Sequence, residues 1–141
     1  MSYLDNYGVA DAKKEQRRRR VILTLLAIVV VAGSLFLWFK NYRQEQRVQE
    51  FLALLERGDY STAYTLWGCK VEAPCPNYDY KSFLEDWGSA SPVGKVKSWR
   101  VGRSRETGSG VVIGIVVNNG KPIRLWVERS NGVLGFAPSL L

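Results

Sequence analysis

The residue types that most often do chemistry are scarce in this chain of 141 residues, which has two cysteines and no histidine. Without histidine it lacks the usual general base, the usual metal ligand, and the base of Ser-His and Cys-His nucleophile pairs. Cys69 and Cys75 alone cannot complete a four-ligand zinc site, and their spacing does not match the C-x-x-C redox motif. The sequence therefore predicts no catalytic residue, no metal centre and no cofactor.

Cys69 and Cys75 are instead predicted to form a disulfide bond. They flank a loop that contains Pro74 and Pro76, and two prolines exclude regular structure there. Such a bond persists outside the cytoplasm, and closing so short a loop stabilises the fold by about 2 kcal/mol. The alternative is a pair of buried free thiols that act as small hydrophobic residues.

Two further sets of side chains could serve a pocket. Asp86, next to Trp87, could be a desolvated general base, although a solvated carboxylate in the last turn of a helix is the more ordinary interpretation. The large rings could line a site for an apolar ligand, but rings of this size more often fill a core. These rings belong to Tyr60, Tyr64, Trp67, Tyr80, Phe83, Trp87, Trp99, Trp126 and Phe136.

The elements that must position these side chains begin with an apolar run over residues 21–39, which contains no charge and no proline. As a helix it would be about 28 Å long, close to the thickness of a bilayer's hydrocarbon core, and a backbone in lipid must be helical. A buried core helix and a cleaved signal peptide are the alternatives, but the run is long for a signal peptide. The predicted transmembrane helix includes Val21, Leu25, Ile28, Leu35, Trp38 and Phe39.

Charge sets the expected orientation of this helix. Arg17, Arg18, Arg19 and Arg20 precede the run, and the positive-inside rule then places the N-terminus in the cytoplasm. We expect a cytoplasmic basic tail over residues 1–20, the transmembrane helix over 21–39 and an extracytoplasmic domain over 40–141. The expected location is the bacterial inner membrane, crossed once. Asp11 is the expected cap of the helix, which should continue without a break through residue 57.

Beyond the anchor, the hydrophobic pattern predicts an α+β domain with helices on one face of a curved antiparallel sheet. Gly58 should end the first helix, and Asp59 and Asp79 should cap the next two. The strand over 111–117 is apolar on both faces, which predicts a central, covered strand. The expected helices are 41–57, 60–67 and 80–87, and the expected strands are 95–105, 111–117, 122–129 and 133–137, with a hairpin at Asn118-Asn119-Gly120.

The segment from Phe51 to Tyr64, F-L-A-L-L-E-R-G-D-Y-S-T-A-Y, is followed by a short helix that ends in glycine and then by antiparallel strands. Over about residues 45–141 this order resembles the nuclear-transport-factor-2-like (cystatin-like) superfamily. The resemblance implies a cone-like sheet, with either an isomerase or dehydratase pocket or a non-catalytic scaffold domain on a single-span protein. The enzymes' catalytic positions do not carry over to this chain. It is also similar to small single-span assembly factors of respiratory complexes.

The strands carry a basic and aromatic set that we predict to be a contact surface. Of the net charge of +7, residues 1–20 supply +3, from six Lys or Arg against three acidic residues. The remaining excess is too dispersed for a nucleic-acid site, so no nucleic-acid partner is expected. Trp and Arg dominate interface energies, although a solvated strand face is the alternative. The candidate contact residues are Trp99, Arg100, Arg103, Arg124 and Trp126.

These observations favour a membrane-anchored, non-enzymatic interaction or accessory subunit of a membrane protein complex. Its expected partners are the lipid bilayer and other membrane protein subunits, with no metal. The alternative, which follows from the resemblance, is a pocket that binds a small apolar ligand or acts as an isomerase. That alternative requires an enclosed cavity that holds at least one carboxylate or a pair of tyrosines.

Overall fold

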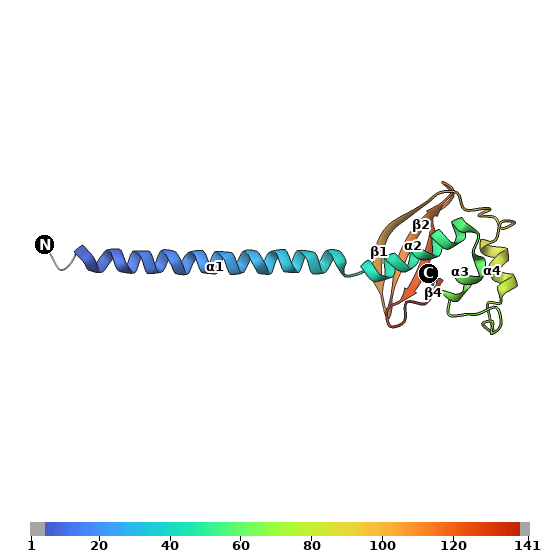
Figure 1. Ribbon diagram of the computed structural model, residues 1–141, viewed down its shortest axis with the longest axis horizontal. Helices are drawn as coiled ribbons and strands as arrows, with labels where there is room; N and C mark the ends of the chain where they lie inside the picture. Colours follow the sequence, from blue (N-terminus) through green and yellow to red (C-terminus); the bar gives the residue numbers. More distant parts are fainter. Residues whose placement is uncertain (1–4, 139–141) are drawn as a thin grey trace. The chain divides into compact units, whose positions relative to one another are not determined.

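The computed structural model describes residues 5–138 and divides into two compact units, Met1–Lys40 and Asn41–Leu141. The first unit is the helix α1 (Asp5–Phe39) (Figure 1). It begins before Asp11, so the expected cap at that residue is wrong. Ala10 and Ala12 flank Asp11, and the run Lys13 to Gln16 follows it; these residue types favour helix.

Between residues 21 and 39, the large apolar side chains of α1 are 50–83% exposed. None of the apolar window of α1 is buried within the described chain. By length and composition, α1 can cross a membrane.

The second unit begins with a break that the sequence did not predict. Lys40 and Asn41 form a turn, and α2 (Tyr42–Arg57) starts after it. Asn41 Nδ2 donates a hydrogen bond to Ser104 Oγ over 3.1 Å, and Ser104 Oγ donates to Glu45 Oε1 over 2.8 Å. The prediction of one unbroken helix was therefore wrong, because the partner of Asn41 lies 63 positions away in the chain.

Local chemistry sets the bounds of the three helices in this unit. Gly58 ends α2 with φ at 76°, a backbone conformation that glycine adopts without strain. The carboxylate of Asp59 accepts from the Thr62 N–H at the start of α3 (Tyr60–Thr65). The carboxylate of Asp79 accepts from the Ser82 N–H at the start of α4 (Tyr80–Trp87). These three predictions of helix ends are confirmed, although α3 stops two residues earlier than expected.

Four antiparallel strands follow in sequence order: β1 (Trp99–Thr107), β2 (Gly110–Val117), β3 (Ile123–Glu128) and β4 (Leu134–Phe136). The sheet is open, with β1 and β4 at its edges. The hairpin at Asn118 and Asn119 is confirmed, and both residues have positive φ, as a tight hairpin turn requires. The cone shape implied by the resemblance stays a prediction.

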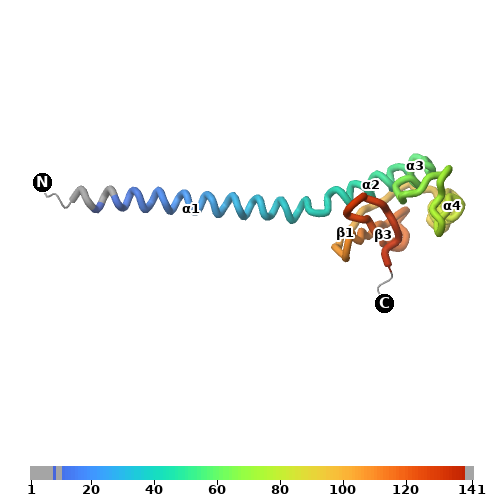
Figure 2. The backbone as a smooth tube through the Cα atoms, turned by 90° about the horizontal axis from the view of Figure 1, so that it is seen from below, coloured from blue at the N-terminus to red at the C-terminus, as the bar shows by residue number. Residues whose placement is uncertain are grey.

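The helices and the sheet form two layers. Within the second unit α2 lies along one face of the sheet, with α3 and α4 beyond it (Figures 1 and 2). Alternate residues of β2 are buried beneath α2, and the residues between them are partly exposed. β2 is central, as predicted, and within the described part of the second unit α2 packs against one of its faces.

The core contains a cluster of aromatic rings among aliphatic side chains. Phe51, Phe83 and Trp87 are at most 1% exposed. The Phe51 ring lies 5.1–6.2 Å from those of Phe83, Trp87 and Trp67, centroid to centroid. The Trp67 ring lies 6.2–6.3 Å from those of Phe83 and Trp87. Most of the predicted aromatic set thus packs ring against ring, and Trp126 stands apart on the uncovered face of the sheet.

Candidate functional site

The face of the sheet opposite α2, which we call the outer face, can be built from the strand register. Val112 lies between Arg105 of β1 and Trp126 of β3, and Trp126 is next to Gly135 of β4. Gly114 faces Arg124, and Val116 faces Arg100. The outer face therefore consists of Arg100, Arg105, Val112, Gly114, Val116, Arg124, Trp126 and Gly135, with Glu128 at one end.

Trp126 lies back against the strands beside it. A Cβ atom added to Gly110 would be 2.5 Å from Cζ2 of the Trp126 ring, and one added to Gly135 would be 4.0 Å from its Cδ1. The ring is partly buried in consequence. The glycines on either side thus leave room for the indole ring. Trp126 packs against the neighbouring strands and does not project from the surface.

The structure divides the candidate contact residues between the two faces. Arg100, Arg124 and Trp126 lie on the outer face. Trp99 points toward the helix layer, where its Nε1 donates to Glu56 Oε2 over 2.9 Å. Arg103 is exposed and lies in an irregularity of β1, between Val101 and Ser104.

The predicted contact set included Arg103 but not Arg105, and the irregularity decides which face Arg105 takes. In regular alternation Arg105 would share the face of Trp99 and Val101. The extra residue in β1 shifts the register, so Ser104 faces the helices and Arg105 faces outward. The sequence carries one weak signal for this irregularity, because a glycine inside a strand, here Gly102, often marks a bulge.

The exposed arginines on the outer face, and Arg103 beside it, have no ion-pair partner within the described chain. Arg100, Arg103, Arg105 and Arg124 are exposed, and none forms an ion pair with a described carboxylate. Glu128, at the end of the face, accepts a hydrogen bond from Ser109 Oγ over 3.1 Å. The outer face is thus a basic surface around an indole ring that packs against the sheet.

Gly114 makes a notch in the middle of this surface. A Cβ atom added there would have no atom within 4 Å. Val112 and Val116 stand on the same strand on either side, and Arg124 stands across from it. The notch is therefore an open position without a side chain, between Val112 and Val116 on the same strand, with Arg124 as its cross-strand partner.

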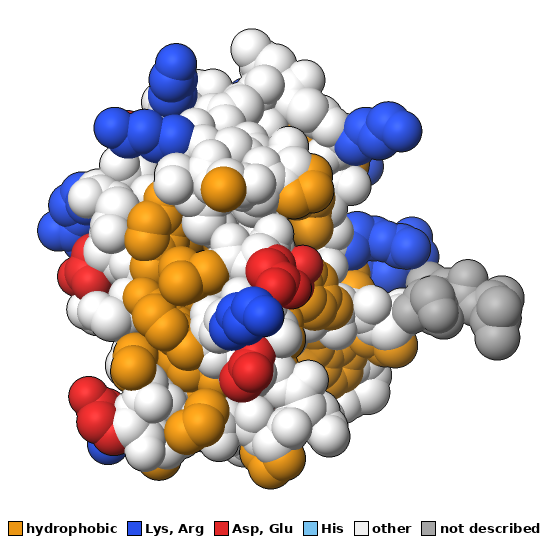
Figure 3. Space-filling view, turned by 90° about the vertical axis from the view of Figure 1, so that its right-hand side faces the viewer, with side chains coloured by type: hydrophobic (Ala, Val, Ile, Leu, Met, Phe, Trp, Pro, Cys, Tyr) orange, Lys and Arg blue, Asp and Glu red, His pale blue; other side chains and the backbone are white. Residues whose placement is uncertain are grey.

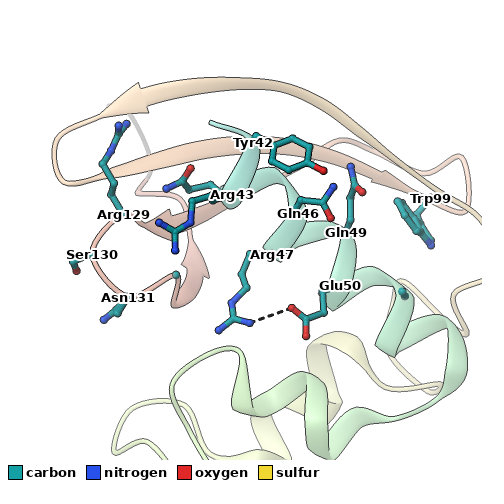
Figure 4. Close-up of a pocket in the computed structure, with 13 residues that line it drawn as sticks. Tyr42, Arg43, Gln46, Arg47, Gln49, Glu50, Trp99, Arg129, Ser130 and Asn131 are labelled. Atoms are coloured by element: carbon teal, nitrogen blue, oxygen red, sulfur yellow. Dashed lines mark hydrogen bonds and ion pairs between the residues drawn. The ribbon is translucent and has the colours of Figure 1, made fainter. Parts of the chain in front are cut away.

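A second hollow runs along the solvent side of α2 and has a volume of about 900 Å³. Figure 4 shows Trp99 at one end of it and Arg129, Ser130 and Asn131 at the other. Two of its arginines are already paired, Arg47 with Glu50 at 3.1 Å and Arg129 with Glu106 at 3.3 Å. Its lining is Tyr42, Arg43, Gln44, Gln46, Arg47, Gln49, Glu50, Ala53, Trp99, Arg129, Ser130, Asn131 and Gly132.

The groove along α2 is a weaker site than the outer face. The ion pairs of Arg47 and Arg129 reduce its attraction for an outside anion, because each charge is already matched inside the protein. Gln44 is 8% exposed, and its Oε1 is buried without a hydrogen bond. Buried oxygen of this kind accepts a donor such as water, and does not by itself define a ligand.

Asp86, the carboxylate considered as a general base, is exposed at the surface. It accepts a hydrogen bond from Tyr78 Oη over 2.8 Å. Burial of Tyr78 and this hydrogen bond to Asp86 raise the pKa of Tyr78 well above its ordinary value. The environment of Asp86 is that of a solvated surface carboxylate.

The aromatic core opens to the surface at Phe136, which is 48% exposed. Its ring lies 4.9 Å from that of Trp67 and is stacked on that of Trp87 at 6.1 Å. Apolar side chains also gather in the middle of the face of the second unit that Figure 3 shows. The structure gives no charge or shape that selects a ligand there.

No protein-family model, curated protein or solved structure matches the chain.

Proposed function

We propose that this chain is a membrane-anchored, non-enzymatic interaction subunit of a membrane protein complex, and that the outer face is its contact surface. The observation that carries the proposal is that one whole face of the sheet is uncovered and carries exposed arginines around Trp126. Trp and Arg are the residue types that contribute most to binding energy in protein interfaces.

The alternative for such a face is simple solvation. A solvated strand face usually mixes the two signs of charge, with polar side chains between them. On the outer face the central strand β2 instead presents Val112, Gly114 and Val116. A partner would remove this apolar strip from water and also satisfy the arginines beside it, so the surface suits contact better than solvation.

We propose further that α1 is the anchor, that the N-terminus is cytoplasmic and that the second unit lies outside a bacterial inner membrane. The support is the basic cluster at residues 17–20 before the apolar run, which the positive-inside rule assigns to the cytoplasm. The Cys69–Cys75 disulfide, with the two Cα atoms 5.3 Å apart, is of the kind that persists in an oxidising compartment.

The nuclear-transport-factor-2-like assignment remains a proposal that the corner at Gly58, Asp59 and Tyr60 supports, together with the antiparallel strands. A small-molecule pocket in this fold has less support. The rings that would line it contact one another, and the groove along α2 is open and polar. The interaction subunit is therefore the function that we put forward.

Site-specific photo-crosslinking tests the proposal. A photoreactive residue replaces Val116 on the outer face, or Lys70 in the disulfide loop as a control, in the full chain in native membranes. We expect one discrete adduct with a membrane protein from position 116 and none from position 70. Equal adducts from both positions, or none together with a monomer in mild detergent, would contradict the proposed function.

Topology is tested separately with alkaline phosphatase, which is active only outside the cytoplasm, fused to the C-terminus. We expect an active fusion. An inactive fusion would overturn the proposed orientation. The proposal that the outer face is a contact surface would still be decided by the crosslinking experiment.

A further inference from the structure

We propose that the outer face binds an acidic segment of a partner polypeptide. A carboxylate of that segment pairs with Arg124, and one of its apolar side chains occupies the notch at Gly114. This inference rests on the proposed function and deepens it by naming the chemistry of the partner.

The charge of the partner follows from the arginines. Arg100, Arg105 and Arg124 are exposed on the outer face, and none has a described carboxylate as an ion-pair partner. A guanidinium group presents a planar fork of donors that matches a carboxylate in a bidentate arrangement. Acidic side chains would therefore complement this face and basic ones would be repelled.

The apolar part of the partner follows from the centre of the face. No atom lies within 4 Å of the Cβ position at Gly114. The notch is bordered along the strand by Val112 and Val116, and across the strand pair by Arg124. A partner side chain that enters it would bury apolar surface directly beside a charge pair. An acidic residue and an apolar residue that are close together fit these two features.

A lipid surface fits the outer face less well. Peripheral membrane binding inserts projecting apolar side chains below the headgroups. The Trp126 ring instead lies back against Gly110 and Gly135, and Val112 and Val116 are partly buried. Single-stranded nucleic acid is also disfavoured, because it is bound by successive exposed rings and Trp126 is the ring that the register places on this face.

The notch allows a substitution that separates binding from folding. Gly114→Val adds a side chain where the structure has open space, and valine favours strand conformation. The fold should therefore be kept while the notch is filled. Gly114→Ala fills less of it and should have a smaller effect. Arg124→Glu reverses the charge at the border, and Lys70→Glu makes the same change of charge on the exposed disulfide loop.

The test uses the full chain in nanodiscs of zwitterionic lipid and measures fluorescence anisotropy of three labelled 12-residue peptides. One alternates Glu and Val, one alternates Glu and Gly, and one alternates Lys and Val. We expect the Glu/Val peptide to bind about tenfold more tightly than the Glu/Gly peptide, as a buried apolar contact adds to the charge contacts. The Lys/Val peptide should not bind.

Arg124→Glu and Gly114→Val should each weaken binding of the Glu/Val peptide by about tenfold, with Gly114→Ala between wild type and Gly114→Val, and Lys70→Glu should change it by less than about twofold. Circular dichroism checks that each variant folds. If Gly114→Val does not fold, then Arg124→Glu and Arg100→Glu carry the test. Equal losses with Lys70→Glu would overturn the inference.

The same test also distinguishes an acidic peptide from other classes of ligand. The inference is overturned if vesicles of phosphatidylglycerol or a single-stranded oligonucleotide bind in an Arg124-dependent manner while the Glu/Val peptide does not. A specific crosslink at position 116 without peptide binding would retain the proposed function and reject the acidic segment. Loss of the crosslink itself would reject the proposed function.

Discussion

The hydroxyl group of Tyr64 donates a hydrogen bond to the backbone carbonyl oxygen of Tyr78 over 2.6 Å. The Tyr64 hydroxyl oxygen also accepts a hydrogen bond from the backbone N–H of Cys75 at 3.3 Å. Tyr64 itself is fully buried in the core. One buried side chain on α3 therefore fixes the far end of the disulfide loop to the aromatic core.

Tyr64→Phe should lower the free energy of unfolding by about 1–3 kcal/mol, because the substitution leaves two backbone groups of the loop without their partner. Urea unfolding of the full chain in detergent, followed by tryptophan fluorescence, measures this. Tyr80→Phe is the matched control, since its ring also packs on Phe83 while its hydroxyl makes no described hydrogen bond. A loss as large in Tyr80→Phe would show that the Tyr64 hydrogen bonds are not the cause.

The disulfide gives a second prediction for the same loop. Replacing both Cys69 and Cys75 by serine should lower the free energy of unfolding by about 2 kcal/mol. The effect is modest because the two cysteines are only 6 positions apart in the sequence, so the disulfide closes a short loop in the unfolded chain. Dithiothreitol should have the same effect on the wild-type chain and none on the double variant. Crosslinking at position 116 should persist in the double variant, since the loop lies apart from the outer face.

Asn118 is predicted to be a structural side chain in the hairpin between β2 and β3. Its Oδ1 accepts the N–H groups of Lys97 and Ser98 at 2.8 and 3.2 Å. Its Nδ2 donates to the carbonyl oxygens of Val93 and Lys95 at 3.1 and 2.9 Å. The side chain thus holds the segment before β1 against the turn.

Asn118→Gly keeps the positive φ of the turn but removes these four hydrogen bonds, and it should lower the free energy of unfolding by about 2–3 kcal/mol. Asn119→Gly is the control, because Asn119 also has positive φ, at 56°, and its side chain makes no described hydrogen bond. Thermal unfolding should show a clear drop for the first variant and little change for the second. Equal drops would assign the effect to backbone flexibility.

The local features of this fold could be read from the sequence, because the residues that cause them are neighbours in the chain. Asp59 and Asp79 cap helices that start at the next residue, and Gly58 ends the one before. Cys69 and Cys75 are close enough in sequence for their pairing to be predicted. None of these depends on a contact with a distant part of the chain.

The features that sequence reasoning missed depend on distant contacts. The break at Asn41 is held by Ser104, and no local pattern reveals that bond. The irregularity in β1 between Val101 and Ser104 reverses the alternation after it, so regular alternation would assign Arg105 to the wrong face. Trp99 was grouped with Arg100 although neighbouring strand residues face opposite ways, and the structure separates them. The notch at Gly114 needed the register of β2 and β3.

The helix caps predict how stability depends on acid. Hydrogen bonds from Thr62 lower the pKa of Asp59 below its ordinary 3.8, and those from Ser82 do the same for Asp79. The unfolded chain binds protons at a higher pH than these folded carboxylates do. Their contribution to stability is therefore fully present above about pH 4 and is lost as the pH falls through the lowered values.

The double variant Asp59→Asn with Asp79→Asn keeps an oxygen acceptor at each cap but removes the titration, since Asn also caps helices well. Its urea midpoint should fall less steeply than that of the wild type between about pH 5 and pH 2. The same slope in both proteins would mean that other carboxylates cause the acid sensitivity.

Two glycines of β2 give the last prediction, because they look alike in sequence and differ in space. A Cβ atom at Gly110 would lie 2.5 Å from both the Trp126 ring and the Val127 carbonyl oxygen, whereas one at Gly114 would meet nothing within 4 Å. Gly110→Ala must displace the ring or the strand, and overpacking of this kind costs about 1–3 kcal/mol. Gly114→Ala should be neutral or stabilising, because it restricts the unfolded chain without a clash.

Thermal unfolding of the two variants separates these effects, and the tryptophan emission of the chain, to which Trp126 contributes one of five indole rings, reports a change in the surroundings of the ring. Gly110→Ala should lower the melting temperature by about 4–8 °C or more and shift the emission to longer wavelength, because the ring leaves its seat for water. Gly114→Ala should leave both unchanged or raise the melting temperature. If the two variants unfold at the same temperature, Trp126 does not rest on Gly110, and the indole ring would then be free to project from the outer face as a lipid-inserting group.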